Sequence, residues 1–297
     1  MLDRSRFRIT THTTIQAAKS PMPELPEVET VCRGLAHVMD GRRLVRLDLH
    51  RPDLRFPFPE GLRQRVEGRR IDVVGRRAKY ILIRLDDGGT MIGHLGMSGR
   101  MMIGRHTNEP LGRHDHVVFV LEDGVTIRFN DPRRFGFLDF AEKGTLEAHP
   151  MLATLGPEPL SDAFTGAVLA ARLAGRKTSI KAALLDQKTV AGIGNIYASE
   201  ALYWAGISPR RSAEHVAGAR ADRLAGSIKT VLNRAIAAGG SSLRDFVQTS
   251  GELGYFQHQW AVYGREGEPC PDCDCGKTIQ KFVQNARATF YCAHRQR

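Results

Sequence analysis

PELPEVET, at Pro23–Thr30, is the stretch of this 297-residue chain from which the fold is best read. From its second half onward, apolar residues recur at spacings of three and four, at Val28, Val31, Leu35 and Val38. This spacing places them on one face of a helix. We therefore expect a helix that begins in the octet and packs that face against a core.

The first residue of the octet offers reactive chemistry. Met22 precedes Pro23, so a chain started at Met22 and trimmed of its methionine begins with the secondary amine of Pro23. An α-amino group has an unperturbed pKa of about 7.7–8.0 and can attack a carbon electrophile near neutral pH. Glu24, the next residue, can carry protons beside it. In a chain that keeps residues 1–22, Pro23 is an internal amide with no nucleophilicity.

Residues 1–22 therefore decide whether this amine exists. They are rich in Arg, Ser and Thr and lack the apolar core of a secretory signal. A transit peptide is one interpretation. A start codon assigned too far upstream is the simpler one, and we favour it because it gives Pro23 a chemical role.

Composition narrows the class of protein. The hydrophobic fraction of 42% and the charged fraction of 25% are ordinary for a globular chain. The net charge of +11 is not ordinary and points to a polyanionic partner. No apolar run is long enough to span a bilayer, so we expect no membrane association.

After the first helix the pattern changes to short apolar runs of strand length. They lie at 44–49, 71–74, 79–85, 90–95, 116–121, 125–129 and 137–140. Turn signals such as Asp87-Gly88-Gly89 and Asp123-Gly124 separate them. Short strands with regular turns are typical of an antiparallel sandwich or barrel. We expect a β-sandwich domain at 23–150.

A second domain follows the segment LGPEPLSD, whose prolines suit a linker at 151–160. Ser161 or Asp162 is the expected N-cap of the first helix of this domain. Helical spacing then predicts helices near 161–173, 178–187, 195–205, 213–238 and 242–249. The helical domain is placed at 161–258, and a region of short strands at 259–297. The fold class is therefore α+β multidomain.

Several polar clusters interrupt these elements. Lys79 heads an apolar strand, which by itself indicates only a surface lysine. HLGMSG at 94–99 is a glycine-rich turn whose Met97 suits either a core or a wedge between bases. NDPRRFG at 130–136 is a basic loop tip with an aromatic beside it, which suits phosphate contact or a solvated hairpin end. RHDH at 113–116 is a further polar cluster.

The segment GIGNIYASE, from Gly192, is more informative. Asn195 begins a predicted helix, and free N–H groups at a helix N-terminus form a ready phosphate site. Arg176, Lys177 and Lys181 are expected to form a basic rim just upstream. A loop at 250–256 suits either a lid or a connector.

Four of the five cysteines crowd the last 28 residues, and Cys32 lies far away. The four are Cys270, Cys273, Cys275 and Cys292. Such clustering favours a zinc site in a reducing compartment over a disulfide framework.

Taken together, these motifs resemble the bacterial formamidopyrimidine-DNA glycosylases. PELPEVET, RRAKY, HLGMSG, RHDH, DPRRFG, GIGNIYASE and the cysteine hairpin follow the family's order and spacing over residues 22–297. The PELPEVE start is similar to this branch rather than to the endonuclease VIII branch. The resemblance implies a leading helix and β-sandwich, a helix–two-turns–helix domain and a terminal zinc-finger β-hairpin. It also implies a monomeric cytoplasmic enzyme of bacteria.

The resemblance further implies an activity and roles for individual residues. The activity is that of a bifunctional DNA glycosylase/AP lyase that excises oxidised purines from duplex DNA through an iminium on Pro23, followed by β- and δ-elimination. The implied catalytic residues are Pro23, Glu24, Lys79 and Arg287. The implied DNA contacts are His94, Met97, His114, Arg133, Arg134, Phe135, Arg176 and Asn195, with Met97, Arg134 and Phe135 filling the void left by the extruded nucleotide. Arg176 stands where relatives often carry lysine.

The sequence departs from the family pattern at the zinc site, where Arg295 stands in the usual place of the fourth cysteine. We expect one structural zinc held by Cys270, Cys273, Cys275 and Cys292, with His294 as the alternative ligand. Two other functions stay open on the sequence. One is a lesion-binding protein without catalysis, if residues 1–22 are retained, and the other is a general zinc-containing binder of DNA or RNA.

Overall fold

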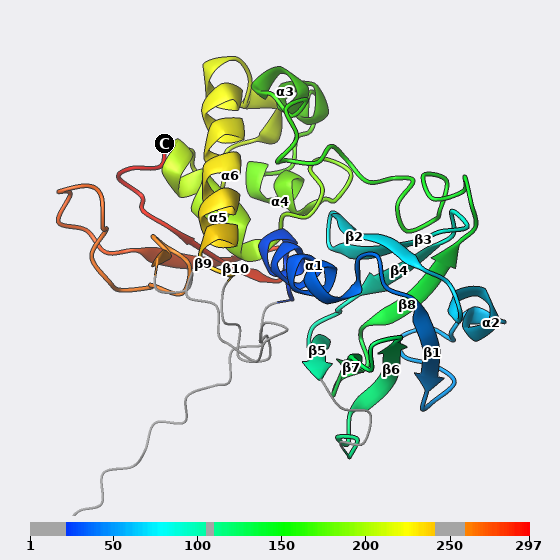
Figure 1. The fold of residues 1–297 in the computed structure, drawn as a ribbon. Coiled ribbons are helices and arrows are strands. Elements are labelled where there is room, and N and C mark those ends of the chain that lie inside the picture. Colours follow the sequence, from blue (N-terminus) through cyan, green and yellow to red (C-terminus); the bar gives the residue numbers. More distant parts are fainter. Residues whose placement is uncertain (1–21, 105–109, 241–258) are drawn as a thin grey trace, which may run out of the picture.

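The computed structural model describes residues 22–104, 110–240 and 259–297. Its N-terminal part is a sandwich of two four-stranded antiparallel sheets, preceded by helix α1 (Leu25–Met39) (Figure 1). The predicted leader up to residue 21, the predicted helix at 242–249 and the predicted loop at 250–256 lie outside the described residues.

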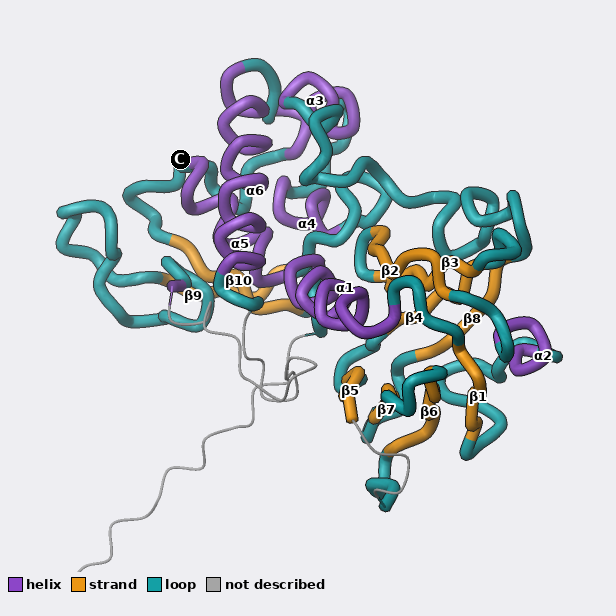
Figure 2. The backbone as a smooth tube through the Cα atoms, viewed as in Figure 1, coloured by secondary structure: helices purple, strands orange, loops and turns teal. Residues whose placement is uncertain are grey.

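The two sheets contain strands that are adjacent in space but often distant in the chain. One has the order β1 (Leu44–Leu49), β6 (Asp115–Leu121), β7 (Thr126–Asn130) and β5 (Arg100–Gly104). The other has the order β2 (Ile71–Arg77), β3 (Tyr80–Leu85), β4 (Thr90–His94) and β8 (Phe137–Ala141). The predicted sandwich is confirmed, and Figure 2 shows its strands gathered on one side of α1.

Two elements of this part are absent from the sequence prediction. Strand β5 lies at a sheet edge, pairs only with β7, and has mostly half-buried residues. Helix α2 (Leu62–Val66) is only five residues long and buries just Leu62 and Val66. In both, too few side chains are buried to produce a clear apolar period.

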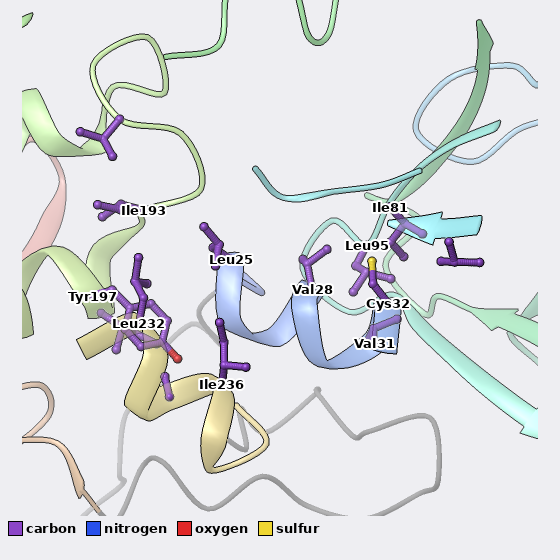
Figure 3. Packing of buried hydrophobic residues seen from close by; sticks show 14 of the residues in the cluster. Leu25, Val28, Val31, Cys32, Ile81, Leu95, Ile193, Tyr197, Leu232 and Ile236 are labelled. Atoms are coloured by element: carbon purple, nitrogen blue, oxygen red, sulfur yellow. The ribbon is translucent and has the colours of Figure 1, made fainter. Parts of the chain in front are cut away.

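Helix α1 forms because its apolar residues share one face, as predicted, and because Glu24 and Glu27 close a capping box at its start. Its core contacts divide between two domains (Figure 3). Val31 and Cys32 lie toward Ile81 of the sandwich, whereas Leu25 lies toward the helical domain. One continuous apolar core therefore runs from the sandwich through α1 into the helices.

The helical domain contains α3 (Gly166–Leu173), α4 (Ile180–Leu185), α5 (Asn195–Ala205), the short 3₁₀ helix η1 (Ala213–His215) and α6 (Ala219–Ala237). The single helix predicted over 213–238 is therefore interrupted. Gly218 separates η1 from α6, with a φ of 52° that a helix interior does not allow.

The predicted N-cap of the first helix is also wrong. Thr165 caps α3, because its hydroxyl accepts the N–H of Val168 at 3.3 Å. Ser161 instead donates its hydroxyl to the carbonyl of Glu158 at 3.1 Å and closes a turn. The stretch from Ser161 to Phe164 consequently joins the linker rather than the helix.

The C-terminal part is a β-hairpin of β9 (Gln280–Gln284) and β10 (Arg287–Tyr291), paired in antiparallel register. Its apolar side rests on α5 through Tyr203, and the cluster includes Phe290 and Cys292. Within the described residues, no helix is long and apolar enough to cross a membrane.

Packing of α3 on α6 yields a prediction with an internal control. A methyl group on Gly166 would lie 2.0 Å from the carboxylate of Asp222 and 2.6 Å from its backbone, so Gly166→Ala should lower stability by about 1–3 kcal/mol through overpacking. Gly226 is exposed within α6 and faces open space, so Gly226→Ala should raise stability by roughly 0.5–1 kcal/mol. Denaturant unfolding of both variants measures this, and shifts of the same sign would contradict the packing.

Candidate active site

The site begins at the start of α1, where PELPEVET changes from extended chain to helix. Pro23 is buried and Glu24 is the N-cap residue. The backbone N–H of Glu24 donates to the Glu27 carboxylate at 3.0 Å, and the Glu27 carboxylate also accepts the hydroxyl of Tyr197 at 2.6 Å. The predicted nucleophile and proton carrier are thus held at a helix start that is itself anchored to α5.

The carboxylate of Glu24 occupies the N-terminus of α5. It accepts the N–H groups of Gly194 at 2.7 Å, Ile196 at 2.9 Å and Tyr197 at 3.4 Å. The prediction that this terminus offers free N–H groups to a DNA phosphate is therefore wrong, because a carboxylate of the same chain already binds there. Gly194 permits the approach, since a methyl group on it would lie 2.3 Å from the Glu24 carboxyl carbon.

Burial of Glu24 raises its pKa to about 7. The nearby ammonium of Lys79 and the N–H groups of Ile196 and Tyr197 oppose this rise, whereas the charge of Glu27 adds to it. Burial disfavours the ionised carboxylate more than these partners favour it. Glu24 is consequently a carboxyl group that is about half protonated at neutral pH, which is the range suited to proton transfer.

Two cations face this carboxyl group from different elements. Lys79 follows β2 and is half-buried, and its pKa is lowered by burial and by the charge of Arg287, against the opposing effect of Glu24. Arg287 is the exposed first residue of β10. Lys79 therefore lies in electrostatic range of both Glu24 and Arg287, with Pro23 adjacent to Glu24 in the chain.

A third cation of this cluster was not recognised from the sequence. Lys181 is not part of a basic rim, as predicted, but is 1% exposed. Its ammonium donates to the carbonyl of Ala288 at 2.9 Å and to the hydroxyl of Thr289 at 2.7 Å. Its pKa is lowered to about 7, mainly by burial and also by the charge of Arg287, against the opposing effect of Glu24. The only available signal was its place among the buried positions of a helix of apolar residues.

Asn195 lies in the same junction. Its amide group donates to the carbonyl of Ala288 at 3.0 Å and lies 3.5 Å from the hydroxyl of Tyr263. The side chain thus helps Lys181 to hold β10 against the helices. Its predicted phosphate contact stays a prediction.

The HLGMSG and DPRRFG motifs form one interlocked pair of loops. The buried carboxylate of Asp131 accepts the hydroxyl of Ser98 at 2.5 Å and the N–H of Gly136 at 2.8 Å. Gly96, with a φ of 63°, lies directly against the backbone of Phe135, since a methyl group on Gly96 would be 2.3 Å from its carbonyl carbon. Asp131 is not among the predicted site residues. Its position inside the motif DPRRFG was the signal that could have identified it.

This interlock places the three predicted void-filling residues on neighbouring loops. Met97 is half-buried, whereas Arg134 and Phe135 are exposed. Arg134 has a φ of 57°, which turns the loop tip outward, and the guanidinium of Arg133 lies 4.9 Å from the ring of Phe135. A basic, aromatic tip of this kind suits contact with a nucleic acid.

The remaining predicted DNA contacts have varied surroundings. His94 stacks on Phe137, and its Nδ1 accepts the N–H of Gly96 at 3.0 Å. Burial lowers the pKa of His94 to about 4, with Lys79 and Arg55 adding to the shift, so the ring is neutral at pH 7.

His114 and Arg176 lie elsewhere on the surface. His114 is half-buried beside His116, with ring centroids 6.2 Å apart. Arg176 is paired with the carboxylate of Asp186 at 2.8 Å, which compensates part of its charge. The predicted DNA contacts of these two residues stay predictions.

Four thiols meet where β9 and β10 join the preceding loop. The Sγ atoms of Cys270, Cys273, Cys275 and Cys292 all lie within 4.8 Å of one another, and those of Cys273 and Cys292 are 3.7 Å apart. Four thiolates around one Zn²⁺ have sulfur atoms about 3.8 Å apart, from Zn–S bonds of about 2.3 Å. The four thiols fit one structural zinc, and among the described residues His294 is not part of the cluster.

Arg295, which stands where the family pattern has a cysteine, contributes in another way. Its guanidinium pairs with Asp272, lies 4.8 Å from the ring of Tyr203, and donates to the carbonyl of Tyr203 at 3.1 Å. It therefore ties the second half of the hairpin to α5 without binding metal.

Comparison with known proteins establishes the relationship. The family model for the formamidopyrimidine-DNA glycosylase N-terminal domain matches residues 22–138, and the model for the H2TH domain of the same enzymes matches residues 155–247. Formamidopyrimidine-DNA glycosylase of Brucella ovis is 54% identical over 289 residues, covering 92% of this chain and 99% of that protein. The enzyme of Rhodospirillum centenum is 55% identical over 290 residues, covering 93% and 100%.

The chain belongs to the formamidopyrimidine-DNA glycosylase family.

Solved structures of the family agree with this assignment. MutM (Fpg) of Thermus thermophilus is 40% identical with a TM-score of 0.81, covering 92% of this chain and 98% of that one. Fpg of Lactococcus lactis, in complex with DNA containing N7-benzyl-Fapy-dG, is 32% identical with a TM-score of 0.83, covering 92% and 99%. The predicted family, its three-part fold and its zinc-finger hairpin are confirmed.

The zinc ligands of this chain can be tested with cysteine variants. Cys273→Ala removes one thiolate from the cluster, so we expect most of the zinc to be lost, together with the docking of Arg287 and at least about tenfold in base-excision rate. Cys32→Ala is the matched control, because Cys32 is buried in α1 and its thiol donates to the carbonyl of Gly75. Elemental analysis for zinc measures both, and full zinc content in Cys273→Ala would contradict the ligand set.

Proposed function

We propose that this chain is a bifunctional DNA glycosylase/AP lyase that removes oxidised purines, such as 8-oxoguanine and formamidopyrimidines, from duplex DNA. The observation that carries the proposal is the buried Glu24, whose pKa is about 7, directly after Pro23 and close to Lys79, which is in turn close to Arg287. A nucleophile, a proton donor and two phosphate-binding cations then meet at one point. The Lactococcus lactis relative was crystallised with lesion-containing DNA, which supports the same substrate class here.

Base removal uses the first two residues of the site. The neutral amine of Pro23 forms a bond to C1′ of the damaged nucleotide while the glycosidic bond breaks, and the departing base receives the proton of Glu24. The nitrogen then loses its proton, the C1′–O4′ bond opens, and O4′ is protonated. Because Pro23 is a secondary amine, the product is a positively charged iminium.

Strand cleavage follows from this charge. The iminium withdraws electrons from C2′, so a C2′ proton can be lost and the C3′–O bond can break, releasing the 3′ phosphate by β-elimination. A second, δ-elimination releases the 5′ phosphate. Lys79 and Arg287 bind the phosphates and stabilise the charge that develops on them.

DNA binding must expose C1′ by extruding the damaged nucleotide from the stack. We assign Met97, Arg134 and Phe135 to the space it leaves, because they lie on two interlocked loops with an exposed tip. His94, His114, Arg133, Arg176 and Asn195 are assigned to the DNA backbone and the site around it. Zinc held by the four cysteines supplies structure to the hairpin that carries Arg287. We propose that the enzyme acts in the bacterial cytoplasm as a monomer.

The mechanism requires a free amine, so we propose that the active chain begins at Pro23. Protein starting at Pro23 should form a covalent adduct with 8-oxoguanine DNA on borohydride reduction. Protein that keeps residues 1–22 is the matched control, because its Pro23 is acylated; it should bind the DNA and form no adduct. Intact mass defines each N-terminus. No adduct from the Pro23 form would overturn the proposal, and binding without cleavage would favour a lesion-binding protein instead.

The raised pKa of Glu24 predicts the pH dependence of base release. Deprotonation of Pro23 increases the rate as pH rises towards about 8, whereas deprotonation of Glu24 decreases it as pH rises through about 7. A bell-shaped profile results. Glu24→Gln cannot donate a proton, so base release should fall roughly 10²–10⁴-fold and its residual rate should lose the decreasing limb.

Single-turnover release of 8-oxoguanine as a function of pH measures this prediction. DNA that already contains an abasic site is the control substrate, because no base has to leave it. Glu24→Gln should therefore impair its cleavage much less. An unchanged bell-shaped profile in the variant would exclude Glu24 as the proton donor.

A further inference from the structure

The segment predicted to be a linker contains a half-buried carboxylate that holds the turn between two strands. We call this carboxylate and the groups that it binds the clamp. Glu158, in the middle of LGPEPLSD, has a side chain only 23% exposed. Both of its carboxylate oxygens are directed at the turn that joins β2 to β3. This turn consists of Ala78 and Lys79.

The contacts hold the peptide groups on both sides of one residue, Ala78. One oxygen of Glu158 accepts the N–H of Ala78 at 2.5 Å and the guanidinium of Arg77 at 2.8 Å. The other oxygen accepts the guanidinium of Arg76 at 2.9 Å, and Arg76 also donates to the carbonyl of Ala78 at 2.9 Å. The N–H and the carbonyl of Ala78 are therefore both held by this cluster.

Ala78 needs such support because of its backbone. Its φ is 53°, in the left-handed region that costs a residue with a Cβ atom about 1 kcal/mol or more. The conformation of Ala78 sets the direction in which the next residue, Lys79, leaves the turn. The carboxylate of Glu158 is the group that binds the N–H of Ala78 in this conformation.

The same segment is bonded to the loop that holds Glu24. The N–H of Gly156 donates to the carbonyl of Gln187 at 2.8 Å, and the N–H of Ala191 donates to the carbonyl of Pro157 at 3.1 Å. The side-chain oxygen of Gln187 accepts the N–H of Gly192 at 2.8 Å, two residues before Gly194.

Continuous hydrogen bonding therefore connects the two halves of the site. It passes from the turn at Lys79 through 156–158 to the loop at 187–194 and the carboxylate of Glu24. Beside the apolar core around α1, these bonds are a second connection between the sandwich, which carries Lys79, and the helical domain, which binds Glu24.

We propose that Glu158 is a positioning residue for Lys79, coupling the interdomain linker to the active site. The proposal rests on the function proposed above. Glu158 touches neither the DNA nor the reacting atoms; it acts by holding Arg76, Arg77 and Ala78 in the one arrangement that directs Lys79 at the site.

The test is a double-mutant cycle with Glu158→Gln and Lys79→Ala. An amide cannot accept at both ends, so Glu158→Gln loses at least one of the three bonds. We expect cleavage of DNA that contains an abasic site, at saturating enzyme, to fall tenfold or more, since a shift of about 1 Å at an active site can cost about 10²-fold, while DNA affinity stays within about twofold. In the Lys79→Ala background, the same change should alter the rate by less than about twofold.

The matched control is Glu29→Gln. Glu29 pairs with the same Arg76 at 2.9 Å but has no bond to Ala78, so its loss should leave the rate within about twofold. If Glu158→Gln fails to fold, Arg77→Gln removes one partner of the clamp and should show a smaller loss with the same dependence on Lys79.

Two outcomes would overturn the proposal. One is an unchanged rate in Glu158→Gln, and the other is an equal loss with and without Lys79. Failure of the proposed function is distinguishable, because the wild-type chain beginning at Pro23 would then release no base and form no adduct.

Discussion

The carboxylate of Glu24, bonded to the N–H groups of Gly194, Ile196 and Tyr197, is the interaction on which the rest of the site depends. Hydrogen bonds to a charged group contribute about 1.5–3 kcal/mol each, yet burial penalises the same charge. Burial outweighs these bonds, and the result is a pKa of about 7. One set of contacts thus joins α1 to α5 and leaves Glu24 partly protonated at neutral pH, as the proposed role of proton donor requires.

The cations near this carboxyl group belong to elements that are far from it along the chain. Lys79 comes from the turn after β2, Lys181 from α4 and Arg287 from the zinc-bearing hairpin. Burial lowers the pKa of both lysines, and Lys181 uses its ammonium to hold the backbone of β10. Zinc held by the four cysteines would stabilise the hairpin that carries Arg287, and so the position of that proposed phosphate ligand.

Local patterns predict much of this molecule. The spacing of apolar residues after PELPEVET predicts α1, and the short apolar runs predict seven of the eight sandwich strands. The clustered cysteines predict the metal site, including a fourth thiolate at Cys273 in place of Arg295. Each of these features depends on neighbours close in sequence, or on a residue type with few other uses.

Long-range pairings are where the sequence is silent. Glu24 is separated by 170 residues from the N–H of Gly194 that it binds, so an empty helix terminus was expected there. Glu158 reads as part of a proline-rich linker, because its partners lie about 80 residues away. Lys181 reads as a surface cation for the same reason. Only the packed domains show that these charges are internal.

Glu24 can act as a proton donor at neutral pH only if its burial by α1 at the start of α5 raises its pKa as described. Carbon-13 NMR of the carboxyl groups measures this pKa directly, in the 297-residue chain labelled at glutamate, with Glu24→Gln used to assign the resonance. We expect one carboxyl resonance, absent from the variant, with a titration midpoint near pH 7. A midpoint near the ordinary glutamate value of 4.5 would contradict it.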